Sequence, residues 1–168
     1  MDTVMYRKRA LGVLIGAVVV FACAYLLLHL DDRGFRPGLP VSLYYYDPAL
    51  DQGPGGPQCS QEGLVAVDRI IPRSPEPVRE AVHLLLDGRL TDEERTRGLV
   101  TEFPLSGVTL ESVMVLDDTA ILTFRDPKHQ TSGGACRSNI VRMQIEATVK
   151  QFPGIAHVRF EPEDLFQH

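Results

Sequence analysis

Residues 137–154 read RSNIVRMQIEATVKQFPG, and this stretch has the pattern of an amphipathic helix followed by a stop signal. Within it, five side chains recur at the i, i+4, i+7, i+8 and i+11 spacing of one buried helix face. Pro153 forces the preceding residue out of helical geometry, and Gly154 follows it. The stretch therefore predicts a helix over residues 137–151 that packs one face on a core. That face consists of Val141, Ile145, Thr148, Val149 and Phe152.

Segments rich in β-branched and aromatic residues lie on both sides of this helix and predict strands. Asp117-Asp118 separates two of these segments and predicts a tight hairpin between them. The predicted strands are Val41–Tyr46, Leu64–Ile71, Gly107–Leu116, Thr119–Phe124 and His157–Phe160.

A second helix is predicted after Ser74-Pro75, which favours an N-cap followed by a proline at the first helical position. Its apolar residues recur at helical spacing from Val78 to Leu86, and Gly88 ends it. The capping box Thr91–Glu94 opens a shorter helical turn. The order β-β-α-β-β-α-β predicts an α+β fold, with one mixed β-sheet and two packed helices.

An apolar stretch near the N-terminus predicts a transmembrane helix. Ala10–Leu30 carries no formal charge, and as a helix it is about 31 Å long, which matches the hydrocarbon core of a bilayer. Basic residues precede it and Asp31-Asp32 follows, so the positive-inside rule orients it. We therefore expect a single-pass protein of a bacterial cell membrane, with residues 1–9 in the cytoplasm, 10–30 in the bilayer, 31–40 as a Gly/Pro linker and the rest outside.

Two other interpretations of the N-terminus stay open. Ala22-Cys23-Ala24 resembles the cleavage site of a signal peptide, and residues 20–23 loosely resemble a lipobox, in which Cys23 is lipidated. An uncleaved anchor is favoured because residues 25–28 continue the apolar run beyond either cut. All three interpretations leave the domain outside the cytoplasm.

The charge and the cysteines of the exported residues limit the kinds of partner and indicate how the domain is stabilised. Residues 31–168 hold 14 basic and 21 acidic side chains, a formal charge of −7, which argues against nucleic acid as a partner. Cys59 and Cys136 lie in this part, and an oxidising compartment favours a disulfide between them over two separate thiols. In the chain-entropy model such a bond stabilises the fold by about 4 kcal/mol.

No catalytic, cofactor-binding or metal-binding set is predicted. No histidine has a second histidine or a cysteine at i+3 or i+4, the spacing of a helical metal site. Neighbouring acidic residues such as Glu93-Glu94 open a predicted helix, where negative charge is favoured, so no glycosidase pair is indicated. We expect a protein that is not an enzyme and needs no cofactor. The histidines are His29, His83, His129, His157 and His168.

A candidate partner surface comes from three residues on the first two predicted strands. Alternation places Tyr44 and Tyr46 on one face of their strand, where tyrosine rings suit a half-buried interface with a glycan or protein. The simpler interpretation is that these rings only cover the sides of an edge strand and bind no partner. Arg69 is a partner anchor or a partly exposed ion-pair residue.

The order of local motifs resembles the GerMN domain, the sporulation and germination module of GerM-like proteins, over residues 41–161, leaving 162–168 as a tail. No single motif is diagnostic, but residues 144–154 are the most specific. The segments are VSLYYY (41–46), VDRIIP (67–72), AVHLLLDG (81–88), TEFPLSGV (101–108), AILTF (120–124), QIEATVKQFPG (144–154) and Val158.

The resemblance implies an extracytoplasmic module tethered by a transmembrane helix or a lipid, with no catalytic set to transfer. It implies a non-enzymatic binding or scaffold role in a sporulation, germination or cell-envelope assembly, with an envelope protein or peptidoglycan as the partner. The alternative is a small cell-wall glycan-binding protein or envelope hydrolase. One domain copy and the cysteine pair distinguish this chain from some members and place a spore-specific role in doubt.

Overall fold

The β-branched and aromatic segment after the linker forms strand β1 (Leu39–Tyr46) in the computed structural model, which describes residues 18–25 and 38–167. It pairs antiparallel with β4 (Leu64–Ile71), from Leu39 opposite Ile71 to Tyr46 opposite Leu64. Both strands were predicted, and β1 begins two residues earlier than expected. Between them lie the small hairpin β2 (Gln52–Gly53) and β3 (Gly56–Pro57), and a 3-10 turn at Gln61–Gly63.

Helix α2 (Pro77–Leu86) begins later than predicted. Glu76 precedes a proline, which disfavours helical backbone at Glu76, and it has φ −120° and ψ 61°. The predicted N-cap Ser74 is therefore wrong: its hydroxyl accepts a hydrogen bond from the Glu76 N–H, at 3.1 Å, in a turn before the helix. The short helix α3 (Asp92–Thr96) has the predicted capping box of Thr91 and Glu94.

The second half of the chain forms a three-stranded sheet with a helix. Strands β5 (Thr109–Leu116) and β6 (Thr119–Arg125) make the predicted hairpin at Asp117-Asp118. Helix α4 (Ala135–Lys150) follows, and β7 (His157–Glu161) then pairs parallel with β6. The segment predicted as a tail after β7 packs into the domain, since Leu165 is only 5% exposed.

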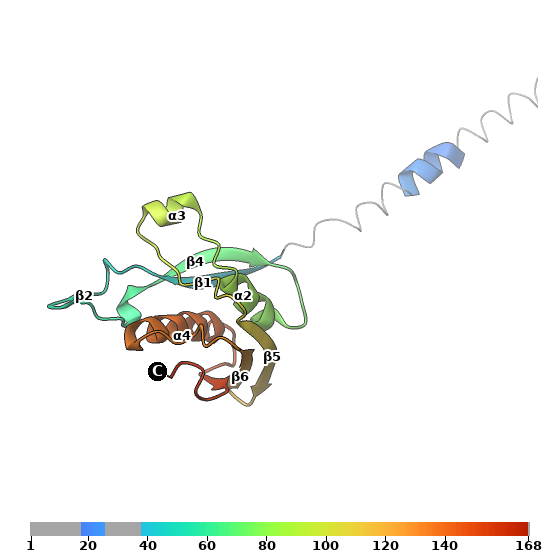
Figure 1. Cartoon of the computed structure of the whole chain (residues 1–168). Coiled ribbons are helices and arrows are strands. Elements are labelled where there is room, and N and C mark those ends of the chain that lie inside the picture. The colour runs from blue at the N-terminus through green and yellow to red at the C-terminus, as the bar shows by residue number, and fades with distance from the viewer. Residues whose placement is uncertain (1–17, 26–37, 168) are drawn as a thin grey trace, which may run out of the picture. The chain divides into compact units, whose positions relative to one another are not determined.

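The expectation of one mixed sheet is corrected. Strands β1 and β4 form a separate two-stranded sheet, and the mixed sheet holds only β5, β6 and β7. Helix α2 contacts β1, β4 and β5, and α4 contacts β1 and β7, so the helices lie between the two sheets and one apolar core joins both, as Figure 1 shows. The mixed α+β class itself is confirmed.

The outer edge of β1 explains why the sheets stay separate. The Ser42 N–H donates to Gln151 Oε1 at 2.7 Å, and Gln151 Nε2 donates back to the Ser42 carbonyl at 2.7 Å. The Tyr44 N–H donates to Thr148 Oγ1 at 3.2 Å. Beyond them, Tyr46 and Val100 exchange backbone hydrogen bonds. From Ser42 to Tyr46, every second residue of β1 is thereby bonded at the outer edge, which leaves no place there for another strand.

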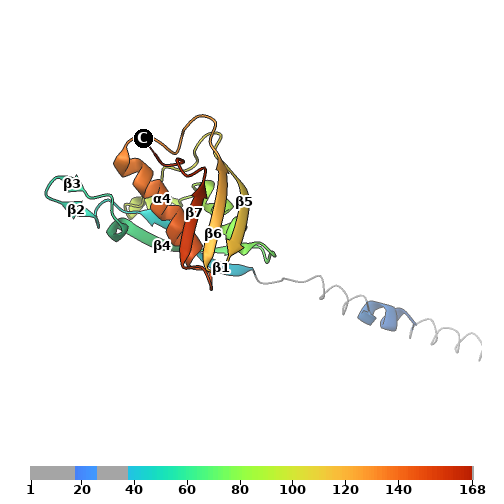
Figure 2. The same ribbon diagram turned by 90° about the horizontal axis from the view of Figure 1, so that it is seen from below.

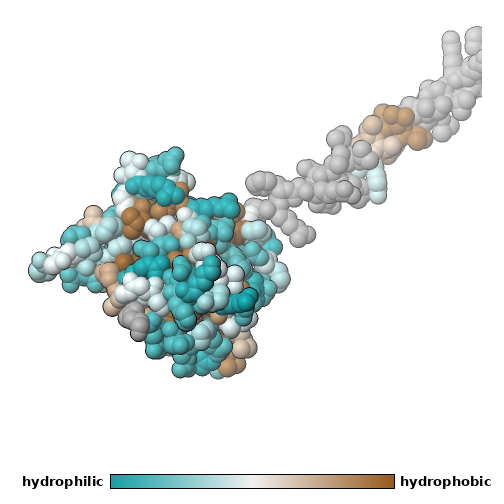
Figure 3. All heavy atoms as spheres, viewed as in Figure 1, coloured by the Kyte–Doolittle hydropathy of each residue, from teal (hydrophilic) through white to brown (hydrophobic). Residues whose placement is uncertain are grey.

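The surface of this domain is mostly hydrophilic on the face that Figure 3 shows. Larger exposed apolar side chains gather at the end of β5, at Met114, Val115 and Leu116. A mostly polar surface fits a folded domain in an aqueous compartment.

The N-terminal segment is described only for residues 18–25, which are helical and include the exposed free thiol of Cys23. No helix within the described ranges, 18–25 and 38–167, has the length and apolar character needed to cross a membrane. Most of the predicted transmembrane helix at 10–30 lies outside the described residues, as do residues 1–9 and most of the linker.

We expect Gln151→Leu to destabilise the domain by about 1–3 kcal/mol, because the Ser42 N–H and carbonyl would lose their partner at a packed edge. Urea unfolding of the full chain measures the change. Gln61→Leu, at an exposed glutamine, is the matched control and should alter stability little. Equal midpoints for Gln151→Leu and the unaltered chain would show that these hydrogen bonds do not hold the edge.

Candidate functional site

A groove of about 900 Å³ lies along α4. Its walls come from the segment after β3, from α4, from β7 and from the residues that follow β7. The lining residues are Pro57, Gln58, Cys59, Ala135, Cys136, Ser138, Asn139, Arg142, Glu146, Val158, Arg159, Phe160, Glu163, Phe166 and Gln167.

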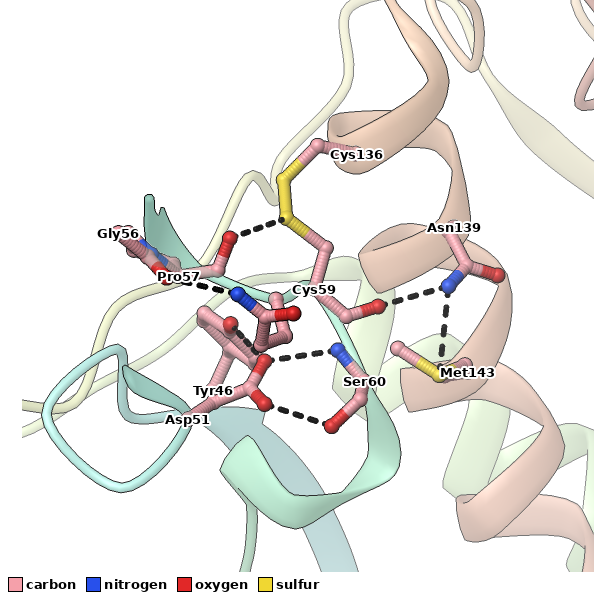
Figure 4. Close-up of a disulfide and its surroundings, with 10 residues drawn as sticks. Tyr46, Asp51, Gly56, Pro57, Cys59, Ser60, Cys136, Asn139 and Met143 are labelled. Carbon is pink, nitrogen blue, oxygen red and sulfur yellow. Dashed lines mark hydrogen bonds between the residues drawn. A yellow bond between two sulfur atoms is a disulfide. The ribbon is translucent and has the colours of Figure 1, made fainter. Parts of the chain in front are cut away.

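The disulfide between Cys59 and Cys136, shown in Figure 4, lines this groove. The predicted pair is thus joined in the structure, with 5.3 Å between the two Cα atoms across 77 residues of sequence. Asn139 Nδ2 also donates to the Cys59 carbonyl at 2.7 Å. The disulfide and this hydrogen bond hold the segment after β3 against the first turns of α4.

A buried carboxylate holds the same segment from its other side (Figure 4). Asp51 is 2% exposed and accepts hydrogen bonds from the Tyr46 hydroxyl at 2.5 Å and from the Ser60 N–H and hydroxyl at 2.7 and 2.6 Å. The hydrogen bond from the Ser60 side chain is the main cause that lowers the pKa of Asp51. Burial, with the Asp51 hydrogen bond second, raises the pKa of Tyr46 to about 12. The cluster keeps Asp51 ionised and Tyr46 neutral, and its role is structural.

Charged side chains of both signs lie along the groove. Arg142 Nη1 contacts Glu146 Oε1 at 2.5 Å, and its Nη2 donates to Asn139 Oδ1 at 3.1 Å. One turn further, Lys150 Nζ is 4.0 Å from Glu146 Oε2. Arg159 and Glu163 add charge on the opposite wall. This arrangement suits recognition of a polar ligand by hydrogen bonds and charge.

The predicted partner residues do not form one surface. Tyr46 is 2% exposed, with its hydroxyl on Asp51, so its place on an open surface is corrected. Tyr44 is half-buried and lines a second hollow of about 400 Å³, together with Gln61, Glu146 and Lys150. Because Glu146 lines both hollows, Tyr44 lies next to the groove and remains a predicted partner residue.

Arg69 belongs to a structural ion pair. Its guanidinium donates to both carboxylate oxygens of Glu94 at 2.9 and 2.8 Å, and to the Arg89 carbonyl at 3.2 Å. Only 21% of the Arg69 side chain and 7% of the Glu94 side chain are exposed. The Arg69 hydrogen bond holds the pKa of Glu94 at about 2. The ion-pair interpretation of Arg69 thus agrees with the structure, and the pair fastens α3 to β4.

Sequence reasoning missed Asp51 and the row Asn139–Arg142–Glu146. The i, i+3 and i+7 spacing of that row was a usable signal, because it places these polar residues on one helix face. The sequence around Asp51 reads as an irregular loop, and nothing local indicates that the carboxylate is buried.

Comparison with known proteins gives one family. The model of Germane, described as sporulation and spore germination, matches residues 42–164. Two solved structures from Bacillus subtilis are similar in fold: the tandem GerMN domains of the sporulation protein GerM and the first GerMN domain of that protein. No curated protein matches the chain.

The structural likeness is moderate and shows the fold alone. The tandem domains give a TM-score of 0.53 at 17% identity, over 79% of this chain and 42% of theirs. The first domain gives 0.51 at 20% identity, over 73% of this chain and 80% of its own. The chain thus spans less than half the length of the tandem structure.

We expect the double variant Cys59→Ser/Cys136→Ser to lose about 4 kcal/mol of unfolding free energy, because the open chain regains the loop entropy that the disulfide removes. Urea unfolding, with and without reductant, measures the loss. Reductant should shift the unaltered chain towards the double variant and leave the variant unchanged. A reductant effect of equal size on both proteins would contradict a role for this disulfide.

We expect Glu94→Gln to destabilise the domain at pH 7 by an amount of order 2 kcal/mol, because the Arg69 guanidinium would lose its anionic partner. The folded-state pKa of Glu94 is lowered from 4.5 to about 2, so the stability that its ionised form contributes is present above pH 4.5 and is lost as the pH falls towards 2. Unfolding curves of both proteins should therefore converge over this pH interval. A constant difference down to pH 2 would contradict the pairing.

Proposed function

Because this chain belongs to the Germane family of sporulation and spore germination domains, we propose that it is a membrane-anchored, extracytoplasmic, non-enzymatic binding module of a bacterial cell envelope. This membership confirms the resemblance inferred from the sequence. In the proposal, residues 10–30 are the single-pass anchor and residues 1–9 stay in the cytoplasm. The groove beside the disulfide binds an envelope protein or peptidoglycan in a cell-envelope, sporulation or germination assembly.

The disulfide between Cys59 and Cys136 is the observation that carries this proposal. Disulfides form and persist in oxidising compartments, which supports a location outside the cytoplasm. The same bond lines the groove, so the feature that supports the location also shapes the candidate binding site. The basic cluster before residue 10 supports the same orientation of the chain.

The chemistry of the groove supports a binding role. Its most buried carboxylate, Glu146, lies between the cationic groups of Arg142 and Lys150. A carboxylate held in this way offers a fixed charge and hydrogen-bond acceptor for a ligand.

A glycan-binding role is the second candidate, and the hollow beside Tyr44 favours it. A half-buried tyrosine ring there lies beside the amide of Gln61 and the charges of Glu146 and Lys150. Such a set offers a flat apolar face and several hydrogen-bonding groups to one ligand. Binding of soluble peptidoglycan fragments that Tyr44→Ala abolishes and Tyr25→Ala leaves intact would favour this candidate.

Protease treatment of intact protoplasts tests the location. We expect a C-terminal epitope on the full chain to be digested from outside, and the two domain cysteines to resist alkylation until reductant is added. A matched chain lacking residues 1–30 should stay protected and carry free thiols, because it is not exported. Protection of the full chain, with digestion only after lysis, would overturn the proposal.

Incubation of the full chain with purified peptidoglycan tests the non-enzymatic role. We expect no soluble fragments to be released, because the groove carboxylate is arranged for binding. Release of fragments that Glu146→Gln abolishes would contradict this expectation and indicate an envelope hydrolase. Glu62→Gln, at an exposed acidic residue outside the groove, is the control.

A further inference from the structure

We propose that the groove beside the disulfide binds an extended peptide segment of a partner protein, which adds as a fourth strand to the outer edge of β7. This inference rests on the proposed binding role and names the chemistry of the partner. The order of strands in the mixed sheet is β5-β6-β7, so β7 is an edge strand.

The outer edge of β7 has backbone groups to offer. In residues 38–167, β6 is the only strand that pairs with β7. A strand that pairs on one side turns the N–H and C=O of alternate residues outwards. Val158, Arg159 and Phe160 of this strand line the groove. The groove therefore gives a ligand access to a β-strand edge.

The wall opposite β7 is a helix. The groove follows α4 from Ala135 to Glu146, which is about 16 Å of helix. The first and last residues of β7 are about 13 Å apart, so the helical wall extends along the whole strand. Figure 2 shows β7 between β6 and α4. A slot between a strand edge and a helix is a geometry that binds peptides by strand addition.

The side chains of the groove determine which peptide fits. The ring of Phe166 packs edge-on against Phe160, with centroids 4.8 Å apart, and provides an apolar floor. Arg142 and Glu146 on one wall, with Arg159 and Glu163 on the other, provide charges of both signs. The complementary segment alternates apolar residues that face the floor with acidic and basic residues that face the walls.

The edges of β1 and β5 are less suitable. The outer edge of β1 is bonded to Gln151, Thr148 and Val100. Strand β5 has a register irregularity between Leu110 and Ser112, and the carbonyl of Glu111 there accepts from Arg79 Nη1 at 3.2 Å. A bulge interrupts the pairing surface of an edge. No residue of β4 lines the groove, so among the outer edges of the two larger sheets in residues 38–167, that of β7 is the one that faces it.

Selection of phage-displayed random decapeptides against the detergent-solubilised full chain tests the inference. Amide hydrogen exchange then locates the selected peptide, and we expect slowed exchange at residues 157–161. Methylation of alternate backbone nitrogens in that peptide should weaken binding about tenfold, while methylation of the intervening nitrogens should have little effect, because only alternate N–H groups pair with the edge. Binding that is insensitive to both patterns overturns strand addition.

A blocking variant tests the place of binding. Ala135→Trp introduces a large side chain at an exposed groove position, and we expect it to weaken peptide binding at least about tenfold. Ala156→Trp, at an exposed alanine outside the groove lining, is the matched control and should bind as the unaltered chain does. Urea midpoints confirm that both variants fold. Equal binding by the two variants overturns the proposed site.

Three other outcomes also overturn the inference. The first two are failure to select any peptide and slowed amide exchange at β5 instead of β7. The third is slowed exchange at β7 that rises with protein concentration in the absence of peptide, which indicates a second copy of the chain. If no peptide is selected and soluble peptidoglycan fragments slow amide exchange in the groove, the ligand is not a peptide, but the proposed binding role stands. Failure of the protoplast experiment, with peptide binding intact, overturns the proposed location alone.

Discussion

Hydrogen bonds from β1 to Thr148 of α4 and to Gln151, the C-cap of that helix, hold the two halves of the domain together. An edge strand leaves alternate backbone groups without partners, and burying them unpaired is costly. Gln151 and Thr148 bond the groups of Ser42 and Tyr44, so a helix takes the place of a neighbouring strand. The two sheets therefore remain separate, and the helices pack between them. This bonding also determines how α4 lies against β1.

The orientation of α4 connects this edge to the groove. Thr148 directs one side of the helix to β1, while Arg142 and Glu146 line the groove on another. The disulfide at Cys136 then fastens the N-terminal end of α4 to the segment after β3, and Asp51 holds that segment from behind. The geometry of the groove follows from contacts at both ends of one helix, made by residues far apart in the sequence.

These long-range contacts explain what the sequence predicts and what it does not. The strands, α4 and the cysteine pair follow from local periodicity, turn residues and redox compartment. Thr148 fits the buried stripe of its helix, but neither it nor Gln151 indicates which strand it bonds, so the division into two sheets is not predictable from these residues. From the sequence, Tyr46 likewise resembles a surface residue, because nothing local indicates the hydrogen bond from its hydroxyl to buried Asp51. The start of α2 was predictable, because Glu76 precedes a proline.

The strand edges of the two sheets differ in whether they can pair with a further strand, and this difference bears on the proposed binding role. Side chains of α4 close β1, and a bulge at Glu111 interrupts β5. These are devices by which proteins prevent unwanted strand pairing. The edge of β7 carries neither device, yet it is only five residues long and lies in a slot walled by α4 and the disulfide. A short strand and a helix beside its edge are further devices that limit unwanted strand pairing. In the proposal, they leave the edge available to a single extended chain.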